Sequence, residues 1–378
     1  MTIAIVGGGL AAATAVTELR ERGYDGELVL FAAENHLPYE RPPLSKDVLL
    51  GKKNVEAAAV HEAGWYRDHD VRIELRTRVT SIDTDAHVLT ARSEAGHESE
   101  LHYDRLLIAT GAVPRHLEAA ERVAHPVYLR TMEDSAGLKA RLTPDAHVVI
   151  IGAGWIGLEV ASAARQAGAR VTMFEVAELP LLRVLGPEVA RVFAELHRHH
   201  GVDLRLGTQV AESDMVEADV LVVGVGAAPA TELAESAGLA VENGILVDTT
   251  LRTSAPDVYA IGDVANHDHP VLGRRIRVEH WDTAIEQGKV VARNLLGAEE
   301  PYVHLPYFFT DQYDLGMEYF GSVGPEGYDR VDIEGDTDVA RGGAFRAYWV
   351  SDGMVVAAMH ANDWDSSDAV RDSVGKPR

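Results

Sequence analysis

Two glycine-rich segments of the chain have the residue types and spacing to hold the phosphates of a nucleotide. They read Ile5-Val6-Gly7-Gly8-Gly9-Leu10-Ala11-Ala12 and Ile150-Ile151-Gly152-Ala153-Gly154-Trp155-Ile156-Gly157. In such a fingerprint the first glycine permits a tight turn and the second lets the backbone approach a pyrophosphate, while the third small residue lets helix and strand pack closely. A single copy is weak evidence. Two copies, each between an apolar strand and an alanine-rich helix, predict two bound dinucleotides and electron transfer between two redox cofactors.

An acidic residue follows the second predicted strand after each fingerprint. Glu175 comes directly after the apolar segment 170–174, and Glu34 lies just beyond the segment 29–31. A carboxylate at this place accepts hydrogen bonds from the ribose of the adenosine and repels a 2′-phosphate. No lysine or arginine stands between Glu175 and Arg183, so the second site is expected to prefer NADH over NADPH. For Glu34, a solvated loop residue is the alternative.

The two fingerprints require two α/β elements to carry them. The chain is predicted to be α/β, with two Rossmann-like dinucleotide-binding domains of the glutathione reductase type and a C-terminal α+β domain. The strand 258–261 and the helix 281–296 return to the first domain, so the second domain is inserted into it. The predicted boundaries are 1–112 with 245–303, then 113–244, and finally 304–378.

Individual elements follow from the same patterns. Each fingerprint is expected to lie between a strand and a helix, and alternating polarity predicts an antiparallel group within the first domain. The predicted strands and helices are 3–6, 10–22 and 27–32 in the first domain; 71–79, 86–92 and 98–108 in the antiparallel group; and 147–151, 156–167, 170–175, 187–200, 203–206 and 219–224 in the second domain.

Composition narrows the function. The chain has 378 residues, a net charge of −24 and no cysteine. The charge argues against nucleic acid or an anionic membrane surface as a partner. No segment reaches the roughly 18 consecutive apolar residues of a membrane helix, and no basic stretch precedes the first strand, so a cytoplasmic protein is expected. Without cysteine, the chain holds no disulfide, no thiolate-ligated cluster and no redox-active thiol, and no metal site is predicted.

Six short segments, taken together and in their order along the chain, resemble those of one family. The loop Arg41-Pro42-Pro43-Leu44-Ser45-Lys46 is the most specific of them; the others are the two fingerprints, Ala109-Thr110-Gly111, Leu129-Arg130-Thr131 and Ala260-Ile261-Gly262-Asp263. The chain is similar to the ferredoxin reductases of bacterial oxygenase systems, which are FAD- and NADH-dependent relatives of putidaredoxin reductase, rubredoxin reductase and apoptosis-inducing factor. The resemblance covers nearly the whole chain.

The resemblance implies roles for single residues. Lys46 would lie near the reactive edge of the flavin, and Glu159 would approach flavin and nicotinamide and pair with Lys46; these two are the expected catalytic residues. The residues implied for the FAD are Gly7, Gly9, Ala11, Ala12, Glu34, Arg41, Lys46, Val79, Thr110, Gly111, Arg130, Asp263 and Trp281. Those implied for the nicotinamide cofactor are Gly152, Gly154, Ile156, Gly157, Glu175, Gly226 and Glu279.

Some positions depart from the family or have a second interpretation. The family usually has an acid at the position of Ala33, so we expect a one-residue shift that gives the ribose contact to Glu34. Trp155 either covers the nicotinamide site or simply packs. Glu159 would otherwise be a charge stabilised by the helix dipole.

The expected activity is the transfer of electrons from NADH through FAD to an acidic [2Fe–2S] ferredoxin or a similar one-electron carrier. The alternatives are an NADH oxidase or quinone reductase, or an NADH-sensing flavoprotein resembling apoptosis-inducing factor. Since the chain itself is acidic, an acidic carrier needs a local basic patch, for which Arg274, Arg275 and Arg277 are the candidates.

Overall fold

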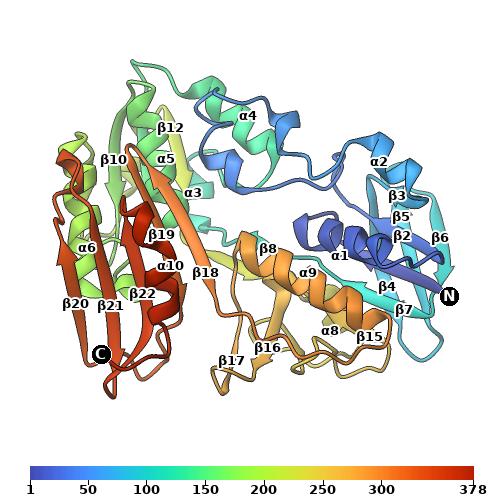
Figure 1. The fold of residues 1–378 in the computed structure, drawn as a ribbon. Coiled ribbons are helices and arrows are strands. Elements are labelled where there is room, and N and C mark those ends of the chain that lie inside the picture. The colour runs from blue at the N-terminus through green and yellow to red at the C-terminus, as the bar shows by residue number, and fades with distance from the viewer. The chain divides into compact units, whose positions relative to one another are not determined.

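The computed structural model describes residues 1–378 and divides into two compact units (Figure 1). The first unit comprises Met1–Glu40, Glu56–Val113 and Ala228–His304, and the second comprises Arg41–Val55, Pro114–Ala227 and Leu305–Arg378. The short strands β8 (Ala112–Pro114) and β13 (Ala227–Pro229) lie where the chain passes between the units. The three domain boundaries inferred from the sequence stay a prediction.

A five-stranded parallel sheet forms the centre of the first unit. Its order is β15–β7–β1–β2–β3, with β1 (Thr2–Val6), β2 (Glu27–Phe31), β3 (Val71–Glu74), β7 (Arg105–Ile108) and β15 (Val258–Ala260). The central strands consist of apolar residues that are almost completely buried, as is typical of a parallel sheet covered on both faces.

Helices α1 (Leu10–Glu21) and α9 (Trp281–Leu295) run side by side in this unit (Figure 1). They approach closely at Gly288, where a Cβ atom would lie 2.9 Å from the Cβ of Thr14 and 3.0 Å from the carbonyl oxygen of Ala11. The remaining helices of the unit are the short α2 (Ala63–Asp68) and α8 (Glu232–Ser236). Because α1 follows β1 directly, the first fingerprint lies at the carboxyl end of the central strand of the sheet.

The other strands of the first unit form two small sheets. One is antiparallel, β4–β5–β6, with β4 (Thr77–Asp83), β5 (Val88–Ser93) and β6 (Glu98–His102); the other is β14–β16–β17, with β14 (Ile245–Val247), β16 (Ala265–His269) and β17 (Arg274–Ile276). The predictions of one antiparallel strand over 71–79 and of another over 98–108 are wrong, because each segment divides between the parallel and the antiparallel sheet. Arg76 has φ 50°, so the chain turns there and β3 joins the parallel sheet while β4 starts the antiparallel one.

A four-stranded parallel sheet carries the second fingerprint. Its order is β11–β10–β9–β12, with β9 (His147–Ile151), β10 (Arg170–Phe174), β11 (Asp203–Arg205) and β12 (Val220–Val223). Its helices are α3 (Glu118–Val123), α4 (Met132–Arg141), α5 (Trp155–Gln166), α6 (Leu182–His199) and α7 (Glu212–Val216). Helix α6 is interrupted at Gly186, where φ is 71°, so the part after this kink begins at Pro187 as predicted and a short turn from Leu182 precedes it.

An antiparallel sheet at the C-terminus belongs to the same unit. Its order is β18–β19–β22–β21–β20, with β18 (Tyr307–Gln312), β19 (Leu315–Gly321), β20 (Arg330–Gly335), β21 (Phe345–Ser351) and β22 (Met354–Ala361), and α10 (Ser367–Ser373) packs on it. The sheet shares a core with α6, where the fully buried Trp349 donates its indole N–H to the carbonyl oxygen of Leu185 at 3.2 Å. This packing sets β18 against α5 and α6.

The predicted fold class is confirmed: parallel sheets of the Rossmann type carry both fingerprints, and a C-terminal sheet follows. No helix of the structure is long and apolar enough to cross a membrane.

Candidate functional site

The first fingerprint is a sharp turn between β1 and α1. Gly7 has φ 120°, and a Cβ atom on it would lie 2.1 Å from the carbonyl oxygen of Ala109. Gly9 is the N-cap of α1 and makes no side-chain cap, and a Cβ atom on it would meet nothing within 4 Å. Ala11 and Ala12 face inward, and Ala12 is fully buried. The first N–H groups of α1 therefore face open space, which suits a dinucleotide pyrophosphate.

The second fingerprint repeats this turn between β9 and α5. Gly152 has φ 101°, and its Cβ would lie 2.4 Å from the carbonyl oxygen of Gly224. Gly154 is the N-cap and again has nothing within 4 Å of a Cβ, while Ile156 beside it is 42% exposed. Gly157 differs from Ala12 because its Cβ would lie 2.1 Å from the carbonyl oxygen of Gly152. Here only glycine fits, and the space before α5 suits a second dinucleotide.

The two acids have different partners. Glu175 accepts hydrogen bonds from the backbone N–H of Ala153 at 2.8 Å and of Ala177 at 2.9 Å. It thereby holds the fingerprint turn itself, in which Ala153 stands between the first two glycines. Glu34 accepts a hydrogen bond from the hydroxyl of Tyr39 at 2.6 Å. Its contact with a ribose stays a prediction.

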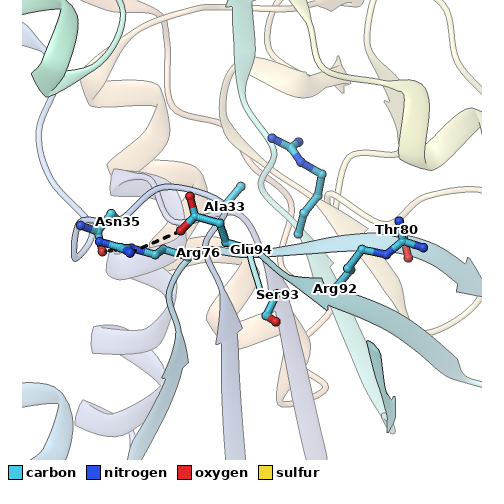
Figure 2. A pocket seen from close by; sticks show the side chains of 8 residues that line it. Ala33, Asn35, Arg76, Thr80, Arg92, Ser93 and Glu94 are labelled. Carbon is cyan, nitrogen blue, oxygen red and sulfur yellow. Dashed lines mark hydrogen bonds and ion pairs between the residues drawn. The ribbon is translucent and has the colours of Figure 1, made fainter. Parts of the chain in front are cut away.

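A pocket of about 540 Å³ opens in the first unit, with Ala33 and Asn35, the two sequence neighbours of Glu34, in its lining (Figure 2). It is lined by Ala33, Asn35, Arg76, Arg78, Thr80, Arg92, Ser93 and Glu94. Arg76 donates to the Asn35 side-chain oxygen at 2.5 Å and lies 3.3 Å from Glu94 (Figure 2). Arg92 pairs with Glu98, outside the pocket. The side chain of Arg78 is exposed and makes neither a hydrogen bond nor an ion pair.

A largely buried ion pair of the second unit joins Lys46 and Glu159. Lys46 ends the 3₁₀ turn Pro42–Ser45, Glu159 lies on α5, and their Nζ and Oε1 atoms are 2.8 Å apart. Glu159 is 4% exposed. It also accepts hydrogen bonds from the hydroxyls of Ser45 and, at 2.7 Å, of Thr310. Three donors therefore stabilise one buried carboxylate, an arrangement that is costly unless complete.

Aromatic and acidic side chains adjoin this pair. The ammonium group of Lys46 lies 5.3 Å from the centre of the Phe309 ring, within the range of a cation–π contact. Asp311 lies two residues after Phe309 on β18. Burial raises the pKa of Asp311, and the charge of Lys46 opposes that rise. Trp155 packs against the rings of Phe193 and Phe308, at 5.9 and 4.9 Å between centres. Packing is thus one role of Trp155.

The remaining residues implied by the resemblance are distributed over both units. In the first unit Thr110 donates to the carbonyl oxygen of Ala230 at 2.8 Å, and Gly111 accepts from the N–H of the same residue. Val79 is buried on β4, Asp263 lies in the 3₁₀ turn Gly262–Val264 and Trp281 begins α9. In the second unit the side chain of Arg41 donates to the backbone oxygen of Arg130, and Gly226 has φ 105°.

Two of the three candidate docking arginines have backbone partners within the first unit. Arg275 donates to the carbonyl oxygens of Val247 and Asn266, both at 2.9 Å. Arg277 pairs with Glu279 and donates to the backbone oxygen of Asp263 at 3.1 Å. Both arginines therefore hold the first unit together, as does Glu279.

Known proteins with similar sequences bear on these sites. The family described as "Pyridine nucleotide-disulphide oxidoreductase" matches residues 1–288. The ferredoxin–NAD(+) reductase component of an anthranilate 1,2-dioxygenase system from Burkholderia cepacia is 39% identical over 381 residues, which cover 95% of this chain and 90% of that protein. The chain belongs to the pyridine nucleotide-disulphide oxidoreductase family.

Further relatives place the chain among the ferredoxin reductases of this family. Putidaredoxin reductase from Pseudomonas putida is 35% identical over 355 residues, 88% of this chain and 82% of that protein. The crystal structure of the covalent putidaredoxin reductase–putidaredoxin complex matches with a TM-score of 0.91 and 32% identity, over 100% of this chain and 94% of that one. The resemblance seen in the sequence is confirmed, and the chain is an oxidoreductase with FAD and NAD(H) as the cofactors of its family.

Two hydrogen bonds to Glu159 were not predicted from the sequence of this oxidoreductase. Ser45 stands inside the most specific segment, directly before Lys46, so its closeness to Glu159 had a signal. Thr310 had none, because it lies 151 residues from Glu159 and only the packing of β18 on α5 joins them. The family name also refers to a disulphide, and this chain contains no cysteine to form one.

Proposed function

We propose that this protein is an NADH-dependent flavoprotein reductase that passes electrons through FAD to a [2Fe–2S] ferredoxin or a similar one-electron carrier of an oxygenase system. The observation that carries this proposal is the pair of glycine turns, each with an open helix N-terminus, in a chain without cysteine. The relatives named as ferredoxin–NAD(+) and rubredoxin–NAD(+) reductases support it.

The first unit is proposed to hold the FAD. The turn Gly7–Gly9 and the N-terminus of α1 would bind the pyrophosphate through backbone N–H groups. The pocket beside Glu34 would take the adenosine end, since ligands of parallel α/β sheets bind beyond the carboxyl ends of the strands. Arg78, which has no protein partner there, would lie against the adenosine. Asp263 would accept from a ribityl hydroxyl.

The second unit is proposed to hold the exchangeable NADH. The turn Gly152–Gly154 and the N-terminus of α5 would bind its pyrophosphate, and Glu175 would accept from the adenosine ribose. Glu175 already accepts from Ala153 and Ala177, so its position is fixed before the nucleotide arrives. Such preorganisation lowers the entropic cost of binding.

The Lys46–Glu159 pair is proposed as the charged group that serves the redox chemistry. The chemistry that a bound flavin supplies is the uptake of two electrons as a hydride and their release one at a time. The ammonium group of Lys46 would stabilise negative charge on a reduced flavin, and Glu159 would hold Lys46 in place. In a buried environment such preorganised charges act more strongly than in water.

The absence of cysteine selects among the acceptors. Relatives that reduce a disulfide need a thiol, so the acceptors left for this chain are one-electron carriers, quinones or oxygen. The test is NADH-dependent reduction of cytochrome c by the purified holoprotein, with and without an added [2Fe–2S] ferredoxin. Rapid reduction only with the ferredoxin is expected. Equal turnover with a quinone or oxygen alone would contradict the proposal and favour an oxidase or quinone reductase. Slow flavin reduction without carrier turnover would favour an NADH sensor.

The basic patch of Arg274 and Arg275 on β17 and the nearby Arg277 is proposed as the docking site of an acidic carrier. At physiological salt, screening over about 8 Å lets such a patch outweigh the net charge. Arg274→Glu should slow ferredoxin reduction several-fold and leave ferricyanide reduction unchanged. Arg170→Glu, an exposed residue of the other unit, is the control. Equal slowing of both acceptors by Arg274→Glu would rule the patch out.

A further inference from the structure

A continuous row of buried polar side chains leads from helix α6 to the Glu159 carboxylate. The Nε2 atom of His197 lies 2.8 Å from the side-chain oxygen of Gln312, whose Nε2 donates to the Thr310 hydroxyl at 3.2 Å. Thr310 in turn donates to Glu159 at 2.7 Å. The row thus crosses from α6 through β18 to α5, all within the second unit.

The chemistry of Glu159 fixes the direction of every hydrogen bond in this row. An ionised carboxylate only accepts, so Thr310 must donate to it. The hydroxyl oxygen of Thr310 then accepts from the amide nitrogen of Gln312, which leaves the amide oxygen of Gln312 to accept from His197. His197 must therefore carry its proton on Nε2, and its Nδ1 must be the acceptor.

The surroundings of His197 agree with this tautomer. Its Nδ1 lies 3.4 Å from the hydroxyl of Tyr313, which can donate to it, and His200 stacks on Tyr313 at 3.7 Å between ring centres. Burial lowers the pKa of His197 to about 4; the hydrogen bond that its Nε2–H donates to Gln312 opposes this, and the charge of His200 lowers the pKa further. The ring is therefore neutral at pH 7 and has one proton to place.

The burial of the row makes its completeness significant. His197 and Gln312 are 0% exposed, and Thr310 is 1% exposed. Apolar side chains of similar size would fill this space without the cost of burying three polar groups. A buried network that is fully satisfied also fixes one conformation of its members.

We propose that His197 is a positioning residue for Glu159, which acts through Gln312 and Thr310 to hold the carboxylate oriented toward Lys46. This inference rests on the proposed function of the Lys46–Glu159 pair. Burial raises the pKa of Asp311, the charge of Lys46 lowers it, and the charges of Glu159 and Asp47 raise it further. The ammonium group thus lies among acids, and the carboxylate paired with it needs a fixed orientation.

The first test reads the tautomer and needs no turnover. In the holoprotein labelled with ¹⁵N-histidine at pH 7, the signal of His197 is identified by its loss in His197→Gln. We expect the shifts of a neutral ring with the proton on Nε2. A proton on Nδ1 would overturn the inference, because Gln312 would then donate to His197 and no donor would be left for Thr310.

The second test is a double-mutant cycle on the reduction of bound flavin by NADH in a single turnover. His197→Phe and Thr310→Val should each slow the reduction about tenfold, on the order of one lost hydrogen bond to a charged group. The double variant should be no slower than Thr310→Val alone, because both changes break one row. His197→Gln, which keeps an N–H donor, should restore most of the rate.

Controls separate this inference from its alternatives. His199→Phe changes an exposed neighbour on α6 and should leave the rate unchanged. Multiplying losses in the double variant, or no rescue by His197→Gln, would mean that His197 acts only through packing. If NADH fails to reduce the wild-type flavin, the proposed function fails, while the tautomer measurement still decides whether the row exists. If His197→Phe does not fold, Thr310→Val with Thr310→Ser as its rescue tests the same donor.

Discussion

The two glycine turns of the chain are nearly the same in backbone geometry and differ in what the following helix presents. Gly7 and Gly152 both have positive φ and both lie against a carbonyl oxygen of a neighbouring segment. Two residues after the third fingerprint position, however, α1 has Thr14 and α5 has Glu159. The two glycine turns therefore share their backbone geometry, and the next helical turn determines whether the helix also carries a buried charge.

The environments of Thr14 and Glu159 show how different these helices are. The hydroxyl of Thr14 donates to the backbone oxygen of Leu10 in its own helix at 2.9 Å, and its methyl side packs at Gly288 of α9. Glu159 instead receives three donors from outside its helix. The first helix packs closely against α9, and the second carries a buried ion pair.

The largest effect should come from breaking that ion pair. Lys46→Met leaves the carboxylate of Glu159 buried with no cation, and removing one partner of a buried pair costs about 3–5 kcal/mol. We expect a loss of this size in the free energy of unfolding, measured in urea at pH 7 with saturating FAD. Lys53→Met is the matched control: its 3.0 Å pair with Asp47 is exposed and should contribute less than about 1 kcal/mol. Equal losses in the two variants would mean that burial does not distinguish the pairs.

The contrast also explains what could be predicted from the sequence. The turns were predictable because they rest on local features, a glycine at positive φ and an apolar strand before it. The partners of Glu159 on β18 were not, because long-range packing brings them together. The break between β3 and β4 had no signal either, since a non-glycine residue, Arg76, adopts the positive φ. Helix α4, which was not predicted, does have a signal in the sequence, namely the capping box of Thr131 and Asp134.

Acid should affect both units through buried histidines, of which His197 and His267 have the largest shifts in pKa. Burial lowers the pKa of His197 to about 4 and of His267, in the first unit, to about 3. Unfolded histidines have a pKa near 6.5, so below that pH the unfolded chain binds more protons and stability falls as the pH falls toward 4. For His197 alone the loss by pH 4 is about 3 kcal/mol.

His197→Gln removes this titration and keeps an N–H donor. Between pH 6.5 and pH 4 its free energy of unfolding should fall less steeply than that of the wild type, by up to about 3 kcal/mol at pH 4. Urea unfolding at a series of pH values measures the difference. Parallel curves would show that His197 is not buried in its neutral form.

The third fingerprint position offers a direct comparison of the turns. Gly157→Ala would place a Cβ atom 2.1 Å from the backbone oxygen of Gly152, so α5 must move, at a cost of about 1–3 kcal/mol. We expect this loss in stability and a weaker affinity for NADH, measured by titration, with the FAD content unchanged. Gly137→Ala, at an exposed site of α4 with nothing near its Cβ, should be neutral or stabilising by up to about 1 kcal/mol. Unchanged NADH affinity in Gly157→Ala would show that the close approach of α5 is not needed.

The smallest effect should come from the two acids, which separate the turns most finely. Glu175→Gln leaves one acceptor oxygen for two backbone donors and removes the charge that would repel a 2′-phosphate. The dissociation constant for NADH should rise about tenfold, as expected for one weakened charged hydrogen bond, and the preference over NADPH should shrink. Glu34→Gln keeps an acceptor for Tyr39 and should leave NADH binding unchanged. A loss of NADH affinity in Glu34→Gln, with none in Glu175→Gln, would reverse the assignment of the two cofactors to the two turns.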